Sequence, residues 1–154
     1  MEEFKPVVFG VAGQKFGIDI SFVQGIEKEQ RICPVPNTPQ HIKGIINLRG
    51  IVIPVFDLRK KLNIEGAPCQ NPQYIILTIN KTFIAIEVDG VEEIHNVQEN
   101  EIHKVPSIIS GGDTGYIQNV LSTEEDLIII IDINKVLTEE ELSQVNDFVK
   151  NQEK

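Results

Sequence analysis

The chain has 154 residues, and its 23 acidic residues against 14 lysines and arginines give it a formal net charge of −9. This charge argues against non-specific binding to nucleic acid or to an anionic membrane surface, because both depend on an excess of basic residues. With 41% hydrophobic residues, the chain has the composition of a globular protein, and its length fits one domain or two small subdomains that share a core.

Neither the N-terminal residues nor the apolar runs have the pattern of a secretory signal or of a transmembrane helix, which needs about 20 apolar residues. We therefore expect a cytoplasmic protein. In that compartment Cys33 and Cys69 are expected to be reduced and unpaired.

The N-terminal part of the chain predicts a β-hairpin followed by an irregular segment. Residues 4–18 are rich in β-forming side chains and are interrupted by a turn at residues 12–14. A helical turn over residues 19–25 is expected next, capped by Asp19 or Ser21 and ended by Gly25. Prolines exclude a continuous helix across residues 33–40, and a threonine followed by proline predicts one short helical turn over residues 38–43.

The stretch from Lys43 to Leu62 predicts a tight hairpin followed by a short helix. Two β-branched runs flank a polar turn at residues 47–50, which is a hairpin signal. Arg49 in this turn cannot point into a core of isoleucine and valine, so it must face water or a partner. Asp57 is expected to cap a helix that continues to Leu62.

The same stretch is the main basic region of an acidic chain. A basic region suits an acidic protein partner, because complementary charges guide the encounter. The alternative for Lys60 and Lys61 is a solvated helix end. The stretch contains one acid, Asp57, and five basic residues, Lys43, Arg49, Arg59, Lys60 and Lys61.

The second half of the chain predicts further strands and a C-terminal helix. Asn80 and Lys81 are expected to connect a hairpin, and residues 99–107 to form a polar loop. A capping box predicts an amphipathic helix over residues 138–150. Strands are predicted over residues 74–79, 82–88, 91–97, 116–121 and 127–133. Roughly nine or ten short strands with little helix predict an all-β barrel or a pair of small barrels.

The sequence contains no recognisable catalytic or metal-binding motif. The three histidines lack His-Glu-x-x-His spacing and have no cysteine at ligand spacing. The glycine-rich residues 111–115 lack the lysine and hydroxyl residue of a phosphate-binding loop. A small barrel without such chemistry most often offers a binding surface.

Five linked motifs stand in order along the chain, at residues 16–20 (FGIDI), 35–39 (VPNTP), 42–50 (IKGIINLRG), 53–59 (IPVFDLR) and 88–91 (VDGV). Together they resemble the CheW-like family of bacterial chemotaxis coupling proteins. The likeness covers about residues 4–137. With no kinase or receiver domain in the sequence, the chain resembles stand-alone members of that family.

The resemblance implies an all-β fold of two five-stranded Src-homology-3-like barrels around a shared core over residues 4–137, with a C-terminal helix over residues 138–150. It implies a non-enzymatic adaptor without cofactor or metal. Such an adaptor bridges the cytoplasmic tip of methyl-accepting chemotaxis receptors and the regulatory domain of the histidine kinase CheA. It is recruited to receptor arrays at the inner membrane face without inserting into the membrane.

The resemblance also implies two sets of contact residues. The receptor-facing set consists of Val23, Gly25, Asn47 and Arg49. The kinase-facing set consists of Gly44, Tyr74 and Ala85. From the residues alone, Val23 could instead pack in the core, Arg49 could brace its own turn, and Gly44 could serve only the turn.

One position departs from the family pattern. Family members can carry an acidic residue where this chain has Gly25, close enough to pair with the loop arginine. Either Glu27 supplies that acid here, or Arg49 is less restrained. Two other functions stay open at this point: a coupling barrel of another chemosensory-type kinase pathway, and an enzyme whose acidic residues converge only in three dimensions.

Overall fold

The computed structural model of the chain describes residues 5–28, 30–36, 42–62, 64, 66, 71–79, 81–94, 97, 99–104, 116–123 and 126–136. Within these residues, eleven short strands form two sheets, and the helices are three or four residues long. None of the helices in this part of the chain has the length and apolar character needed to span a membrane.

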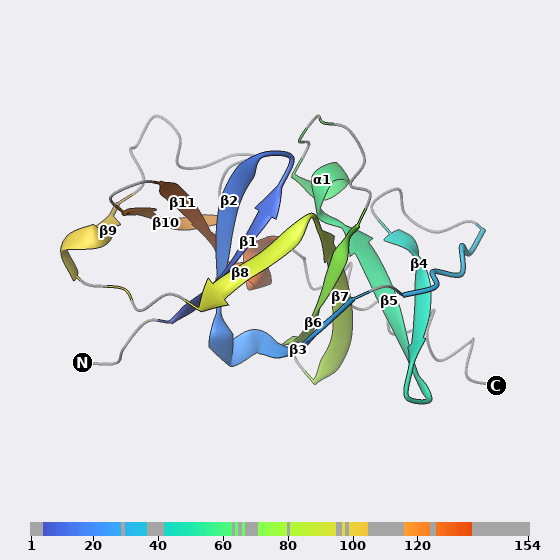
Figure 1. Cartoon of the computed structure of the whole chain (residues 1–154). Helices are drawn as coiled ribbons and strands as arrows, with labels where there is room; N and C mark the ends of the chain where they lie inside the picture. Colours follow the sequence, from blue (N-terminus) through green and yellow to red (C-terminus); the bar gives the residue numbers. More distant parts are fainter. Residues whose placement is uncertain are drawn as a thin grey trace.

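The six-stranded sheet combines strands from both ends of the chain (Figure 1). Its order is β8-β1-β2-β11-β10-β9, and β11 runs parallel to β2 while the other neighbours are antiparallel. The strands are β1 (Pro6–Val11), β2 (Gln14–Asp19), β8 (Gly90–Ile94), β9 (Ile102–His103), β10 (Ile117–Ser122) and β11 (Leu127–Ile131).

The five-stranded sheet is built from consecutive strands, so it forms one continuous insertion between β2 and β8. Its order is β3-β6-β7-β5-β4, with β5 parallel to β7. The strands are β3 (Val23–Glu27), β4 (Ile42–Leu48), β5 (Ile51–Asp57), β6 (Gln73–Ile79) and β7 (Thr82–Val88). The short helices are η1 (Ile20–Phe22), α1 (Leu58–Lys61), η2 (Glu99–Glu101) and α2 (Ile133–Val136).

The five-stranded sheet curls until its two edges meet. β3 and β4 occupy opposite edges of the sheet. The segment that follows β3 nevertheless returns to β4, where Cys33 and Ile45 exchange two backbone hydrogen bonds of 2.8 and 3.0 Å. Figure 1 shows this segment crossing from β3 toward β4. The sheet is therefore a closed barrel rather than an open layer.

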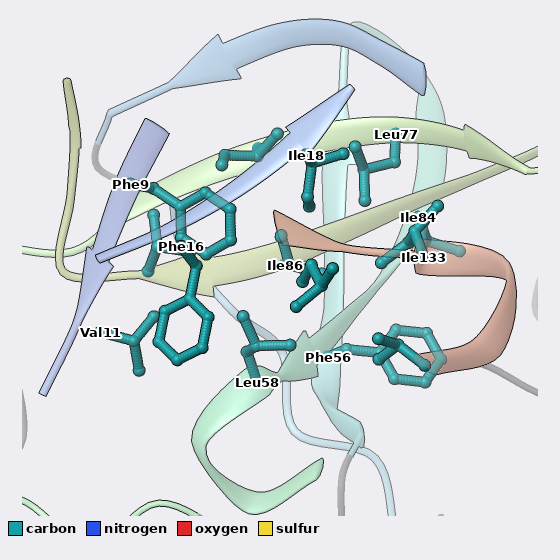
Figure 2. Close-up of a cluster of buried hydrophobic side chains, with 14 of the residues drawn as sticks. Phe9, Val11, Phe16, Ile18, Phe56, Leu58, Leu77, Ile84, Ile86 and Ile133 are labelled. Atoms are coloured by element: carbon teal, nitrogen blue, oxygen red, sulfur yellow. The ribbon is translucent and has the colours of Figure 1, made fainter. Parts of the chain in front are cut away.

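Apolar side chains fill the space between the sheets and the interior of the five-stranded barrel, and a further cluster lies on the six-stranded sheet. The largest cluster lies between the sheets and includes Phe9 and Phe16 from the six-stranded sheet and Phe56 and Ile86 from the five-stranded one (Figure 2). The second cluster consists of Ile46, Ile53, Val55, Tyr74, Ile76 and Ala85. The third consists of Val8, Leu121, Ile128 and Ile130. The two sheets thus share one core and keep one smaller core each.

Strand β6 shows how this arrangement follows from the sequence. Ile75, Leu77 and Ile79 belong to the shared core, whereas Tyr74 and Ile76 point into the barrel of the five-stranded sheet. Because successive side chains of a strand point to opposite faces, a strand buried on both faces needs a nearly continuous apolar run.

Most predicted strands, and the all-β fold, are confirmed. The N-terminal hairpin, the hairpin around residues 49–50 and the hairpin formed by β6 and β7 all form. Asp57 caps α1 as predicted, because its carboxylate accepts hydrogen bonds from the N–H groups of Arg59 and Lys60 at 3.0 and 3.4 Å.

Three local predictions are confirmed only in part. The helical turn predicted over residues 19–25 ends at Phe22, because Val23–Glu27 pairs as β3 with β6. The predicted polar loop contains η2 and the short strand β9, which pairs with β10. The last strand stops at Ile131, and α2 follows it. The turn predicted from Thr38 and the helix predicted over residues 138–150 lie outside the described residues, although β4 already begins at Ile42.

Candidate partner-binding surface

The turn between β4 and β5 holds Arg49 in a defined position. Leu48 pairs with Ile51, so Arg49 and Gly50 form a two-residue connection. Their φ angles of 52° and 88° are the two positive values of a type I′ turn, which matches the twist of a hairpin. The side-chain oxygen of Asn47 accepts a hydrogen bond of 2.9 Å from the N–H of Gly50 and so stabilises the turn.

Arg49 points away from the protein, as predicted, with 83% of its side chain exposed. Its Nη2 lies 3.7 Å from Oε1 of Glu27, a distance at which an exposed ion pair contributes little stability. Of the two alternatives for the departure at Gly25, the structure has Glu27 as the acid beside Arg49. The guanidinium is thus oriented but only weakly held.

Strand β3 brings the other receptor-facing candidates to the same edge of the barrel. Gly25 pairs with Ile76, and a Cβ built on Gly25 would meet no heavy atom within 4 Å. Val23 is partly buried and packs against the shared core. It therefore has the core-packing role that the residues alone left open. Closure of the barrel places β3 beside the turn of β4 and β5. The contact between Glu27 of β3 and Arg49 of the turn joins these two elements.

The three kinase-facing candidates lie inside the barrel. Tyr74 and Ala85 are buried members of the second apolar cluster, inside the five-stranded barrel. Gly44 is covered by the segment after β3, where a built Cβ would collide with the carbonyl oxygen of Cys33 and approach Cγ2 of Ile32 to 2.7 Å. They occupy one region, since Gly44 pairs with Val55 and Val55 pairs with Ala85. Their side chains are therefore not at the surface.

Much of the predicted basic region is neutralised by acids from β7 and the residue after it. Lys43 Nζ contacts both carboxylate oxygens of Glu87, at 2.7 and 3.0 Å, and the hydroxyl of Tyr74 donates to the same carboxylate at 3.0 Å. Arg59 Nη2 lies 2.6 Å from Oδ1 of Asp89. Lys43 and Arg59 are therefore paired, whereas Arg49 and Lys60 are exposed.

The sequence interpretation missed three apolar side chains at the surface of the same barrel, of which Ile26 on β3 is 42% exposed. Ile51 is 46% exposed and Phe83 is 39% exposed. Ile51 shares a strand face with Ile53, and Phe83 shares one with Ala85, so both point toward the open end of the barrel interior. Ile51 is the first residue of β5 and Phe83 the second residue of β7, and both strands are largely buried farther along. The alternation of a strand does not reveal which of its ends stays uncovered.

The two glycines of the contact sets should respond differently to alanine. Gly44→Ala should cost about 1–3 kcal/mol of unfolding free energy, because the new methyl group overlaps the backbone of Cys33. Gly25→Ala, the matched control, should stay within about 0.5 kcal/mol, because the space over Gly25 is open. Urea unfolding of both variants measures the difference. Equal stabilities would contradict the close packing over Gly44.

Comparison with known proteins places the chain in a family. Residues 5–141 match the family model described as CheW-like domain. The chain is 32% identical over 145 residues to the chemotaxis protein CheW of Klebsiella aerogenes, which covers 94% of this chain and 87% of the relative. It is 36% identical over 137 residues to the chemotaxis protein CheW of Bacillus subtilis, which covers 88% of each.

A solved structure extends the likeness to the fold. The scaffolding protein TtCheW from Thermoanaerobacter tengcongensis superposes with a TM-score of 0.80 at 33% identity, over 91% of this chain and 96% of that one. The predicted fold of two Src-homology-3-like barrels around a shared core is thereby confirmed. By sequence and by fold, the chain belongs to the CheW-like domain family.

Proposed function

We propose that this chain is a non-enzymatic chemotaxis adaptor that couples methyl-accepting chemoreceptors to the histidine kinase CheA. The observation that carries the proposal is the match to CheW proteins over most of the chain, at 32% and 36% identity to two of them. Within the described residues, no group of three or more potential metal ligands is assembled. A coupling barrel of another chemosensory-type pathway and an enzyme are the alternatives that the experiments below separate.

The proposed receptor-binding surface is the edge formed by β3 and the turn of β4 and β5. A helix that docks on a surface needs apolar contacts and a few oriented polar groups. Val23 and the open space over Gly25 can receive apolar side chains, and Arg49 supplies an oriented positive charge. Asn47 acts through the turn, which it stabilises by its bond to Gly50. We therefore keep all four residues in the receptor-facing set.

The proposed kinase-binding surface is the open end of the same barrel. Gly44, Tyr74 and Ala85 contribute by shaping the barrel wall, since their own side chains are buried or absent. Ile51 and Phe83 would provide the apolar contact, because exposed apolar side chains beside a packed core are typical of docking sites. Recruitment to receptor arrays at the inner membrane face then follows from binding these two partners.

Phe83→Ser tests the kinase-binding surface. It should weaken binding to the CheA regulatory domain about tenfold, which is usual for loss of a central apolar contact, and leave receptor binding unchanged. Leu127→Ser is the matched control, because Leu127 is also exposed but lies on the six-stranded sheet. Titration calorimetry with each partner measures both affinities. An equal loss of affinity for the kinase domain in both variants, or no loss in Phe83→Ser, would show that the kinase binds elsewhere.

Direct binding of the unmodified chain tests the function itself. The chain should bind a receptor cytoplasmic fragment and the CheA regulatory domain separately. Binding to neither, with binding to a different chemosensory kinase, would support the other pathway. Turnover in a panel of hydrolase and transferase substrates would support an enzyme.

A further inference from the structure

The chain leaves the five-stranded barrel through a single residue. β7 ends at Val88 and β8 begins at Gly90, so Asp89 alone connects a strand of one sheet to a strand of the other. Strands of the inserted barrel precede this point, and strands of the six-stranded sheet follow it. The conformation of Asp89 therefore influences how one barrel is oriented on the other.

Asp89 forms hydrogen bonds with elements of both sheets. On the six-stranded sheet, its N–H donates to the carbonyl of Gly10 at 2.8 Å, and its Oδ2 accepts from the N–H of Ala12 at 2.8 Å. On the other side, its Oδ1 accepts from Nη2 of Arg59 in α1 at 2.6 Å. Figure 1 shows α1 next to the turn of β1 and β2. One carboxylate thus joins elements of both barrels.

Neighbouring residues hold the Arg59 guanidinium, the Asp89 carboxylate and the N–H of Ala12 close together. Arg59 and Asp89 expose 17% and 29% of their side chains, so their ion pair is less screened by water than a surface pair. Ala12 has a φ of 51° and Gly13 a φ of 83°, a turn that directs the N–H of Ala12 to Asp89. A Cβ built on Gly66 would lie 2.8 Å from Cβ of Ala12, so Gly66 also packs closely here.

The other strong ion pairs among the described residues stay within one barrel. Lys15 joins Asp126 and Glu92 on the six-stranded sheet, and Lys43 joins Glu87 on the five-stranded one. The shared core between the sheets is apolar and exerts no directional force, and packed layers can slide by small amounts. Charge-assisted hydrogen bonds, by contrast, have a preferred geometry.

We propose that Arg59, Asp89 and the N–H of Ala12 form an inter-barrel latch that fixes the relative orientation of the two barrels. Arg59 and Asp89 then act as positioning residues.

Distances between spin labels on the two barrels test the latch without any partner. Labels at Gln24→Cys and Gln118→Cys, which replace exposed residues on β3 and β10, report the orientation in a background of Cys33→Ser and Cys69→Ser. Asp89→Asn and Arg59→Gln should broaden the distance distribution, while Arg59→Lys should restore part of its sharpness. Asp126→Asn, which removes an ion pair within one sheet, is the matched control and should leave the distribution unchanged.

Unchanged distributions in Asp89→Asn and Arg59→Gln, or equal broadening in Asp126→Asn, would overturn the proposal. If Asp89→Asn does not fold, Arg59→Gln and Arg59→Lys decide the question.

Discussion

Phe56→Ala is expected to destabilise both barrels together, by about 3–5 kcal/mol, the usual cost of removing a buried phenylalanine. Phe56 lies on β5 with 1% of its surface exposed and belongs to the core that the two sheets share (Figure 2). A loss of this size is a large part of the total stability of about 5–15 kcal/mol of a typical domain. Urea unfolding, followed by circular dichroism and by NMR signals from each sheet, should show one transition with a lower midpoint.

Phe83→Ala provides the control for this prediction. Phe83 is also on the five-stranded sheet but is partly exposed, so its loss should cost no more than about 1 kcal/mol. Two separate transitions in Phe56→Ala, with the six-stranded sheet unaffected, would show that the barrels do not depend on a shared core. A cost as small as that of Phe83→Ala would show that Phe56 is not tightly packed.

Arg49→Ala is expected to weaken receptor binding about tenfold or more, which is the effect of removing a central arginine contact. The fold should stay intact within about 0.5 kcal/mol, because the exposed pair with Glu27 contributes little to stability. The positive φ of residue 49 is held by the adjacent turn and by the bond from Gly50 to Asn47. Titration with a receptor fragment and urea unfolding of the same preparation separate the two effects.

Lys81→Ala is the matched control for Arg49→Ala. Lys81 is also an exposed basic residue with a positive φ, of 66°, beside the hairpin turn that joins β6 and β7. It should bind the receptor fragment as tightly as the unmodified chain. Equal weakening in both variants would indicate general charge attraction, and an unchanged affinity in Arg49→Ala would remove this residue from the receptor surface.

The sequence was sufficient for features that depend on neighbouring residues. The hairpin turn at Arg49 and Gly50, the cap at Asp57 and the strand pair β6–β7 all follow from local patterns that turn and cap preferences explain. The outward direction of Arg49 also followed, because a guanidinium does not fit among isoleucine and valine. Family motifs then supplied the barrel fold, which strand count alone left open.

Features that depend on closure of the barrel could not be read from local patterns. Gly44 seemed suited to a surface role, but the segment containing Cys33 covers it. Lys43 pairs with Glu87, and Arg59 pairs with Asp89, which are far apart in the chain. The sequence alone therefore overestimates the exposed positive charge of this stretch. β9 has only two residues and exists because β10 offers it an edge. In each case tertiary pairing decides the outcome.

Co-sedimentation of the unmodified chain with membrane-bound receptor fragments and CheA, scored by kinase activity in the pellet, tests the adaptor function most directly. The proposed function predicts that the kinase enters the pellet and is activated only when both the chain and the receptors are present. Arg49→Ala should lower that activation while the kinase domain still binds the chain in solution. Kinase recruitment and activity that are the same with and without the chain would contradict the adaptor function.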